Sequence, residues 1–265
     1  MPKVIICEGV TDAILISYML KKVAKYNFSN EKQDKRLPQL PNIPNAQQYW
    51  YVHSDNRLSG KLLIWSVGGI GNIPKAIQSI ITRNINEHDN ESRFDTVAIV
   101  CDRDKSASGK RASEVVGWFK NSNVVMDDTL SECEWTKCSL TQTPDRWSSP
   151  ETMDLKLFLF VLPEGRQGNL ETFLIDAIAK SAEESRTLVQ KSENFIGEVP
   201  PSFFTKERLK SKAQLGAILS VMHPDWVFSE IDRRLTSIPW EELVKMDSWK
   251  KLAEGLCSPV SSPYE

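Results

Sequence analysis

Apolar runs and segments of helical periodicity alternate along this chain. Runs such as residues 4–7 hold consecutive apolar side chains, which is typical of a strand covered on both faces. Apolar residues spaced by three and four positions follow each run and indicate amphipathic helices. The predicted strands span residues 4–7, 62–67, 96–101 and 155–162, and the predicted helices span residues 11–24, 73–84, 110–120 and 170–180. This alternation predicts an α/β fold with a parallel sheet of about four strands flanked by helices.

The remaining segments are less regular. Residues 25–60 are polar and hold three closely spaced prolines, so we expect an insertion or a long loop there. Residues 122–152 show no clear period and are predicted to be irregular. Helical spacing returns in the C-terminal part, at about 206–222, 228–235 and 240–256.

Length and composition are those of a folded chain with a sizeable core. Its 265 residues, 40% of them hydrophobic, allow an α/β domain over residues 1–182 and a helical extension over residues 183–265 packed on it. No apolar run approaches the roughly 20 residues that cross a bilayer. The apolar run at the N-terminus is too short for a secretory signal. We therefore expect a cytoplasmic protein without a membrane partner.

Five cysteines at irregular spacing do not indicate a disulfide framework. Cys7 and Cys101 lie inside apolar runs and are expected to be reduced and buried. Cys133 and Cys138 form a C-x4-C pair, but no second pair or nearby histidine completes a tetrahedral zinc site. Zinc is therefore not expected.

Carboxylates follow two of the predicted strands. Asp102 and Asp104 come directly after the third strand, and Glu8 follows the first strand, with Asp12 four residues later. Open α/β sheets bind ligands at the carboxyl ends of their strands, and grouped carboxylates repel one another unless a cation lies between them. Because Mg²⁺ prefers oxygen ligands, these residues predict a magnesium site, with Glu171 as a further candidate. The alternative is that the two aspartates cap the following helix or turn.

The net charge of −2 gives no general attraction to nucleic acid, so such binding would depend on local patches. The candidate patches are Arg103, Lys105, Lys110 and Arg111 beside the acidic pair, and Lys206, Arg208, Lys210 and Lys212 farther along. Residues of this kind hold backbone phosphates without reading the base sequence. A solvated helix face explains the second patch equally well.

Three rival motifs involve the same regions. A P-loop is excluded because Asp104 stands where its first glycine is required. The glycines of residues 68–71 lack the spacing of a dinucleotide site, which leaves a tight turn or a phosphate-binding turn. Residues 102–106 resemble the haloacid-dehalogenase phosphatase motif, in which the first aspartate is a nucleophile. That family carries the motif on its first strand, so we rank it second.

Together, Glu8-Gly-Val-Thr-Asp12, the glycine turn at Gly68-Gly69 and Asp102-Arg-Asp104 resemble a Toprim domain. This domain is the metal-binding catalytic module of topoisomerases, primases, recombination proteins and several nucleases. The resemblance covers roughly residues 1–120 and implies a Toprim-like sheet. It also implies that Glu8 acts as a general acid/base or metal ligand, and that the two aspartates bind Mg²⁺ or Mn²⁺.

Within this family, the compact chain resembles the nuclease branch. Gly168-Asn-Leu-Glu171 and Lys210-Ser-Lys212 are similar to the later acidic and lysine elements of OLD-like Toprim nucleases. That similarity implies that Glu171 is an additional metal ligand and that Lys212 neutralises charge on the pentavalent phosphate. OLD nucleases carry an ATPase domain in the same chain. The resemblance therefore implies a separate ABC-type ATPase as partner, as in two-component anti-phage systems with a small toxic effector.

The resemblance thus implies a metal-dependent endonuclease that cleaves phosphodiester bonds of DNA or RNA. A latent regulatory or partner-binding subunit and a dehalogenase-type phosphatase are the alternatives. The sequence leaves open whether the substrate is DNA or RNA and whether the chain forms a homodimer. It also leaves open whether Asp12 or Glu171 completes the metal site.

Overall fold

The structure is a computed structural model, and the residues it describes are 2–24, 26–28, 40–41, 43–53, 61–86, 92–107, 109–122, 130–141, 152–204, 206, 208–224, 239–243 and 245–257. The strands are β1 (Lys3–Cys7), β2 (Tyr26–Phe28), β3 (Gln47–His53), β4 (Lys61–Ser66), β5 (Thr96–Asp102), β6 (Trp135–Thr141) and β7 (Thr152–Leu162). The helices are α1 (Val10–Val23), α2 (Ile73–Asn86), α3 (Lys110–Lys120), α4 (Leu170–Ser181), α5 (Glu183–Glu198), α6 (Arg208–Met222), α8 (Trp240–Leu243) and α9 (Asp247–Cys257).

The strands form one mixed, seven-stranded sheet of order β2-β3-β4-β1-β5-β7-β6. β1 pairs in parallel with both β4 and β5. β7 runs in the same direction as β5, because backbone hydrogen bonds join Asp95 to Lys156 and, farther along both strands, Arg103 to Leu162. β2, β3 and β6 are antiparallel additions. The α/β class is confirmed. The four predicted strands are β4, β1, β5 and β7, which form the parallel part of the sheet, but the sheet is larger than expected because it also contains these three antiparallel strands.

Two segments that were predicted to be irregular contain these missed strands. β2 and β3 lie within residues 25–60, and β6 lies within residues 122–152. β3 pairs with a strand on each side, and its Trp50 and Tyr51 are buried. β6 pairs with β7, and its buried Cys138 stands between exposed neighbours. A short edge strand that alternates in this way carries few apolar residues, so its sequence pattern is weak.

Contacts divide the chain into two compact units. Unit 1 consists of Met1–Cys101, Gly109–Val161 and Asp247–Glu265, and unit 2 consists of Asp102–Ser108 and Leu162–Met246. Unit 1 thus holds most of the sheet with α1, α2, α3 and α9. Unit 2 holds α4, α5, α6 and α8 together with the loops that follow β5 and β7. The expected domain boundary after residue 182 stays a prediction.

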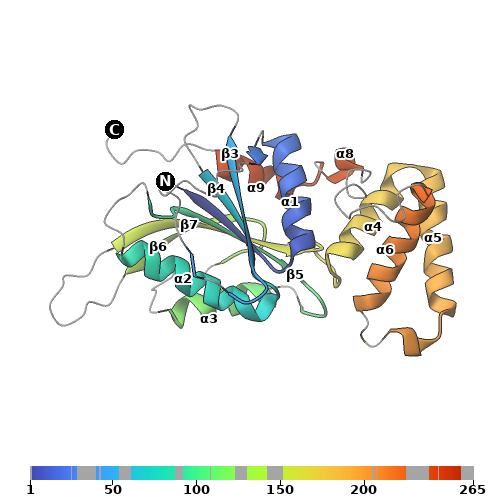
Figure 1. The fold of residues 1–265 in the computed structure, drawn as a ribbon, viewed down its shortest axis with the longest axis horizontal. Coiled ribbons are helices and arrows are strands. Elements are labelled where there is room, and N and C mark those ends of the chain that lie inside the picture. The colour runs from blue at the N-terminus through green and yellow to red at the C-terminus, as the bar shows by residue number, and fades with distance from the viewer. Residues whose placement is uncertain are drawn as a thin grey trace. The chain divides into compact units, whose positions relative to one another are not determined.

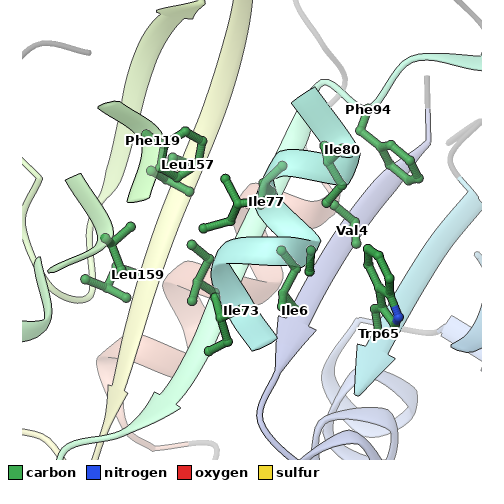
Figure 2. Packing of buried hydrophobic residues seen from close by; sticks show 14 of the residues in the cluster. Val4, Ile6, Trp65, Ile73, Ile77, Ile80, Phe94, Phe119, Leu157 and Leu159 are labelled. Atoms are coloured by element: carbon green, nitrogen blue, oxygen red, sulfur yellow. The ribbon is translucent and has the colours of Figure 1, made fainter. Parts of the chain in front are cut away.

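Helices cover both faces of the sheet in unit 1. α2 and α3 lie along one face, and α1 and α9 lie along the other (Figure 1). Figure 2 shows the first face, where Ile73, Ile77 and Ile80 of α2 point toward strand residues such as Ile6. Their spacing of four and three positions gives α2 the apolar stripe that the sequence predicted. On the other face, Phe160 of β7 packs edge-on against the indole of Trp249 in α9, with ring centroids 4.7 Å apart.

In unit 2, α4, α5 and α6 pack against one another (Figure 1). Their contact surfaces are apolar, and the buried side chains include Phe173, Leu174, Ile178, Ile218 and Leu219. α5 is absent from the sequence prediction because only Ser192 and Ile196 along its length are buried. A mostly solvated helix lacks the wide apolar stripe on which periodicity depends.

The other predicted helices have mixed outcomes. α3 has the predicted bounds, 110–120, and α4 extends one residue beyond its predicted end. The helix predicted at 240–256 is two helices, α8 and α9. The helix predicted at 228–235 lies outside the described residues. None of the helices in the described part of the chain is long and apolar enough to cross a membrane.

Candidate functional site

The loop after β5, which begins with Arg103, is fixed to the loop before α4. Asp104 and Gly168 exchange two backbone hydrogen bonds, of 2.6 and 2.9 Å. The amide of Arg103 donates to the carbonyl of Leu162, and its Nε donates to the carbonyl of Pro163 at 3.0 Å. The Arg103 side chain is therefore a structural tie that is only 3% exposed. A nucleic-acid contact by this residue, as the sequence predicted, would require the side chain to leave this position.

The carboxylate of Asp102 lies at the N-terminus of α4. Its Oδ1 accepts the amide of Leu170 at 2.9 Å. Asn169, the residue before the helix, accepts the amide of Thr172 at 3.1 Å, so side chains satisfy two of the first-turn amides that lack partners within the helix. The positive end of the helix dipole favours a negative charge at this place. Asp102 thus has a capping role, but for α4 rather than for the helix that follows it in sequence.

The segments 168–171 and 210–212 meet in unit 2, as two contacts show. Nζ of Lys212 lies 3.4 Å from Oε1 of Glu171. The Glu171 side chain is 10% exposed and that of Lys212 is 54% exposed, so a nearly buried carboxylate faces a half-exposed ammonium. In addition, Nδ2 of the buried Asn169 donates to Oγ of Ser211 at 3.0 Å. α4 and α6 are therefore held together by polar side chains at this end of α6.

A pocket of about 320 Å³ opens between these segments of unit 2. Its lining residues are Asp104, Lys105, Gln167, Gly168, Asn169, Thr172, Lys210, Ser211 and Gln214. The backbone of Asp104 is left-handed there, with a φ of +53°, a conformation that asparagine and aspartate tolerate better than most residues. The pocket combines two lysines with one aspartate, and its other side chains are amides and hydroxyls. It is therefore suited to a polar ligand that carries negative charge.

The acidic loop after β1 lies in unit 1. The amide of Gly69, in the glycine turn after β4, donates to the carbonyl of Glu8 at 2.7 Å. The amide of Gly9 donates to Oδ2 of Asp12 at 2.7 Å, so this carboxylate caps α1 from within its first turn. α1 begins at Val10, one residue before the predicted start at residue 11, and Gly9 is its N-cap.

The predicted metal ligands are thus divided between the units. Glu8 and Asp12 belong to unit 1, and Asp102, Asp104 and Glu171 belong to unit 2. Their combination in one metal centre stays a prediction.

Cys7, the last residue of β1, is fully buried beside this loop. Burial raises the pKa of its thiol well above the usual value, and the nearby charges of Asp12 and Glu8 raise it further. The thiol is therefore neutral and poorly nucleophilic at physiological pH. Cys7, Cys101, Cys133 and Cys138 are not joined in disulfides. The expectation of reduced, buried cysteines is confirmed for Cys7 and Cys101.

Other basic residues of the predicted patches lie away from the pocket lining. In unit 1, the mostly buried Arg111 pairs with Glu114 at 2.7 Å, and the exposed Lys110 lies 3.9 Å from the same carboxylate. Lys206 is exposed and belongs to unit 2. The side chain of Arg208 lies outside the description. Lys105 and Lys210 are the members of the predicted patches that line the pocket.

The donor atoms in unit 2 fit a magnesium ion only in part. Within the described ranges, no three histidine, cysteine, aspartate or glutamate side chains are grouped so that they could hold a metal ion. Mg²⁺ is, however, commonly bound by one or two carboxylates, with phosphate oxygens and waters as its other ligands. The carboxylates of Asp102 and Asp104 supply that donor chemistry. Among the described side chains, a cage made of protein ligands alone does not fit, whereas these two carboxylates suit an ion whose other ligands are phosphate oxygens and waters.

Several residues of the pocket escaped sequence reasoning. Gln167, Ser211 and Gln214 carry amides and hydroxyls, which have no characteristic spacing in a sequence. One signal was available, since Asn169 and Thr172 stand at the spacing of a capping box just before an apolar-periodic segment. That signal fixes the start of α4 but says nothing about a pocket.

The fold and site define an α/β protein with a polar, lysine-lined pocket at the start of a helix. The chain belongs to the family described as DUF3226, protein of unknown function, whose model matches residues 2–225. No curated protein sequence matches it. Among solved structures it is similar to the crystal structure of hypothetical protein PH0156 from Pyrococcus horikoshii OT3. The similarity has a TM-score of 0.43 and 15% identity, and covers 92% of this chain and 98% of that chain.

Proposed function

We propose that this protein is a Mg²⁺- or Mn²⁺-dependent nuclease that hydrolyses phosphodiester bonds of DNA or RNA. The proposal rests on one observation above all. Three segments that are far apart in the sequence, at residues 102–104, 168–171 and 210–212, meet in unit 2. Residues 102–104 belong to the Toprim resemblance, and the other two segments resemble the later acidic and lysine elements of OLD-like Toprim nucleases.

In this proposal, Asp102 and Asp104 hold the metal ion together with phosphate oxygens of the substrate, and Glu171 is an additional ligand. The bound ion supplies positive charge to the reacting phosphate and lowers the pKa of a bound water. Glu171 is chosen over Asp12 because Glu171 belongs to unit 2 together with the two aspartates, whereas Asp12 belongs to unit 1. Glu8 keeps the general acid/base role that the Toprim resemblance implies.

The lysines of unit 2 provide charge in this proposal. Lys212 is half exposed beside Glu171, so its ammonium is accessible to a phosphate. There it would stabilise the negative charge that develops in the transition state. Lys105 and Lys210 line the pocket and would hold the backbone of the strand.

The first experiment measures cleavage of supercoiled plasmid and of total tRNA with Mg²⁺ or Mn²⁺. Asp102→Asn is preferable to alanine, because the amide oxygen can still accept the Leu170 amide and cap α4. Asp104→Asn likewise suits the left-handed backbone at that position. We expect each substitution to slow cleavage by about 100-fold, which corresponds to about 2.7 kcal/mol of transition-state stabilisation. Glu193→Gln, on the exposed surface of α5, is the matched control and should cleave at the wild-type rate.

The alternatives give different results in the same assay. A dehalogenase-type phosphatase would hydrolyse phosphomonoesters and would tolerate Glu8→Gln, which should inactivate the nuclease. Metal binding by the wild-type chain without cleavage of plasmid or tRNA would contradict the nuclease proposal and favour a regulatory or partner-binding subunit. For the nuclease, the resemblance adds a separate ABC-type ATPase as the proposed partner.

A further inference from the structure

We propose that the pocket of unit 2 binds one sugar–phosphate unit of a nucleic-acid strand and does not read its base. This inference rests on the proposed nuclease function and specifies how the substrate is held. It concerns the pocket itself, which the resemblance does not assign.

Charge determines which end of a nucleotide the pocket can hold. Lys105 and Lys210 contribute two positive charges to the lining, and Asp104 contributes one negative charge. The excess of positive charge favours a phosphate group over a neutral ligand. Asp104 reduces this excess of positive charge without reversing it, and a divalent cation shared with the phosphate would offset its repulsion. The sugar hydroxyls can hydrogen-bond with the hydroxyl and amide side chains of Ser211 and Gln214.

Size and lining favour a small ligand group over an aromatic base. A volume of about 320 Å³ is at the lower end of the range for ligand pockets. It accommodates a single nucleotide unit rather than a duplex segment. No aromatic side chain is among the lining residues of the described pocket. Proteins hold unpaired bases mainly by stacking them on aromatic rings, so the base is not the part that this pocket recognises.

The wall of the pocket is fixed before any ligand arrives. Nδ2 of Asn169 donates to Ser211, which joins α4 to α6 across the pocket wall. Nε2 of Gln167 donates to the carbonyl of Lys105 at 3.2 Å, and Nε2 of Gln214 lies 3.3 Å from Oγ of Ser192 in α5. A preorganised polar wall loses little conformational entropy when a ligand binds.

The test is binding of small fragments to the full chain in EDTA, measured by calorimetry. The probes are ribose 5-phosphate, the four nucleoside monophosphates and the unphosphorylated nucleosides. We expect the four monophosphates to bind within about threefold of one another and the nucleosides to bind at least about tenfold more weakly. Ribose 5-phosphate should compete with all of the monophosphates. A single-stranded oligonucleotide should displace it, which identifies a strand rather than a free sugar phosphate as the ligand.

Two variants locate the binding site. Lys210→Gln and Lys105→Gln should each weaken binding of the monophosphates by about tenfold. Lys191→Gln, an exposed lysine of α5 outside the pocket, should not change it. Three outcomes would each overturn the inference. Nucleosides could bind as tightly as monophosphates, one base could be strongly preferred, or all three lysine variants could bind with equal affinity. Cleavage of nucleic acid by a chain that binds no monophosphate overturns this inference alone, whereas monophosphate binding without any metal-dependent cleavage overturns the nuclease proposal.

Discussion

At the scale of single residues, the ion pair of Glu171 and Lys212 links a nearly buried carboxylate to a half-exposed ammonium. Removing the ammonium leaves the carboxylate without this counter-charge, and burying an unpaired charge is costly. We therefore expect the effect of Lys212→Met to depend on residue 171. The substitution should lower the free energy of unfolding more in the wild-type chain than in the Glu171→Gln variant. The exposure of Lys212 reduces this coupling to about 1 kcal/mol.

Urea unfolding of the wild type, the two single variants and the double variant measures that coupling as a double-mutant cycle. Strict additivity of the two substitutions would contradict the ion pair. The same variants also test the proposed metal site, because Lys212 and a metal ion compete for Glu171. Lys212→Met should therefore increase the affinity for Mn²⁺ while decreasing cleavage, whereas Glu171→Gln should decrease both.

Asp95, just before β5, makes stability depend on pH. Burial raises the pKa of its carboxyl, although a hydrogen bond from Thr96 and the charges of Lys3 and Lys156 act in the opposite direction. The folded state thus binds the proton more tightly than the unfolded state, whose aspartate pKa is about 3.9. The stabilisation from this group is complete below that pKa and is lost as the pH rises through the folded-state pKa.

Asp95→Asn should remove this loss and keep the oxygen that accepts the Thr96 hydroxyl. The free energy of unfolding of the variant, relative to that of the wild type, should therefore increase as the pH rises from acidic values to neutrality. Urea unfolding at a series of pH values checks this expectation. A difference that is independent of pH would show that the ionisation of Asp95 does not affect folding.

At the scale of elements, the contact of α9 with β6 depends on Gly255. A Cβ atom at this position would overlap the indole of Trp135, whose Nε1 donates to the carbonyl of Lys251 in the same helix. Replacing a helical glycine by alanine normally stabilises a protein by up to about 1 kcal/mol. We expect the opposite for Gly255→Ala, a loss of about 2 kcal/mol, because the indole must shift.

Gly117 in α3 is the matched control. A Cβ atom there would meet nothing within 4 Å. Gly117→Ala should therefore raise the thermal unfolding midpoint, while Gly255→Ala should lower it. Equal shifts for the two variants would contradict the packing of Trp135 on α9.

The elements also differ in how well the sequence predicted them. α3 was predicted with its observed bounds, because Ala112, Val115 and Phe119 form an apolar stripe that is buried in the core. β6 and α5 were missed for one shared reason. Each has few buried positions among its described side chains, and a pattern of buried positions is what periodicity detects.

At the scale of the whole molecule, sequence motifs identified the segments of the site but not the pocket they form. Asp102, Glu171 and Lys212 were predicted because each stands in a motif of fixed spacing. Gln167 and Gln214 could not be predicted, since they line the pocket only because the loop before α4 and the middle of α6 meet in unit 2. Such contacts between distant segments depend on tertiary packing, which local sequence patterns do not encode.

The response of nucleic-acid binding to salt should depend on local lysines, because the net charge of the whole chain is −2. A chain with this charge has no general attraction to a polyanion, so binding must come from local lysines such as Lys105 and Lys210. Each phosphate contact to a single strand contributes about 0.7 to the slope of log Kobs against log salt concentration.

The double variant Lys105→Gln/Lys210→Gln should therefore reduce that slope by about 1.4. Fluorescence anisotropy of a labelled single strand over a range of NaCl concentrations measures the slope. Lys180→Gln/Lys191→Gln removes the same charge from exposed positions in α4 and α5 and should leave the slope unchanged. An equal reduction in both double variants would show that only net charge matters and would contradict a lysine-lined phosphate site.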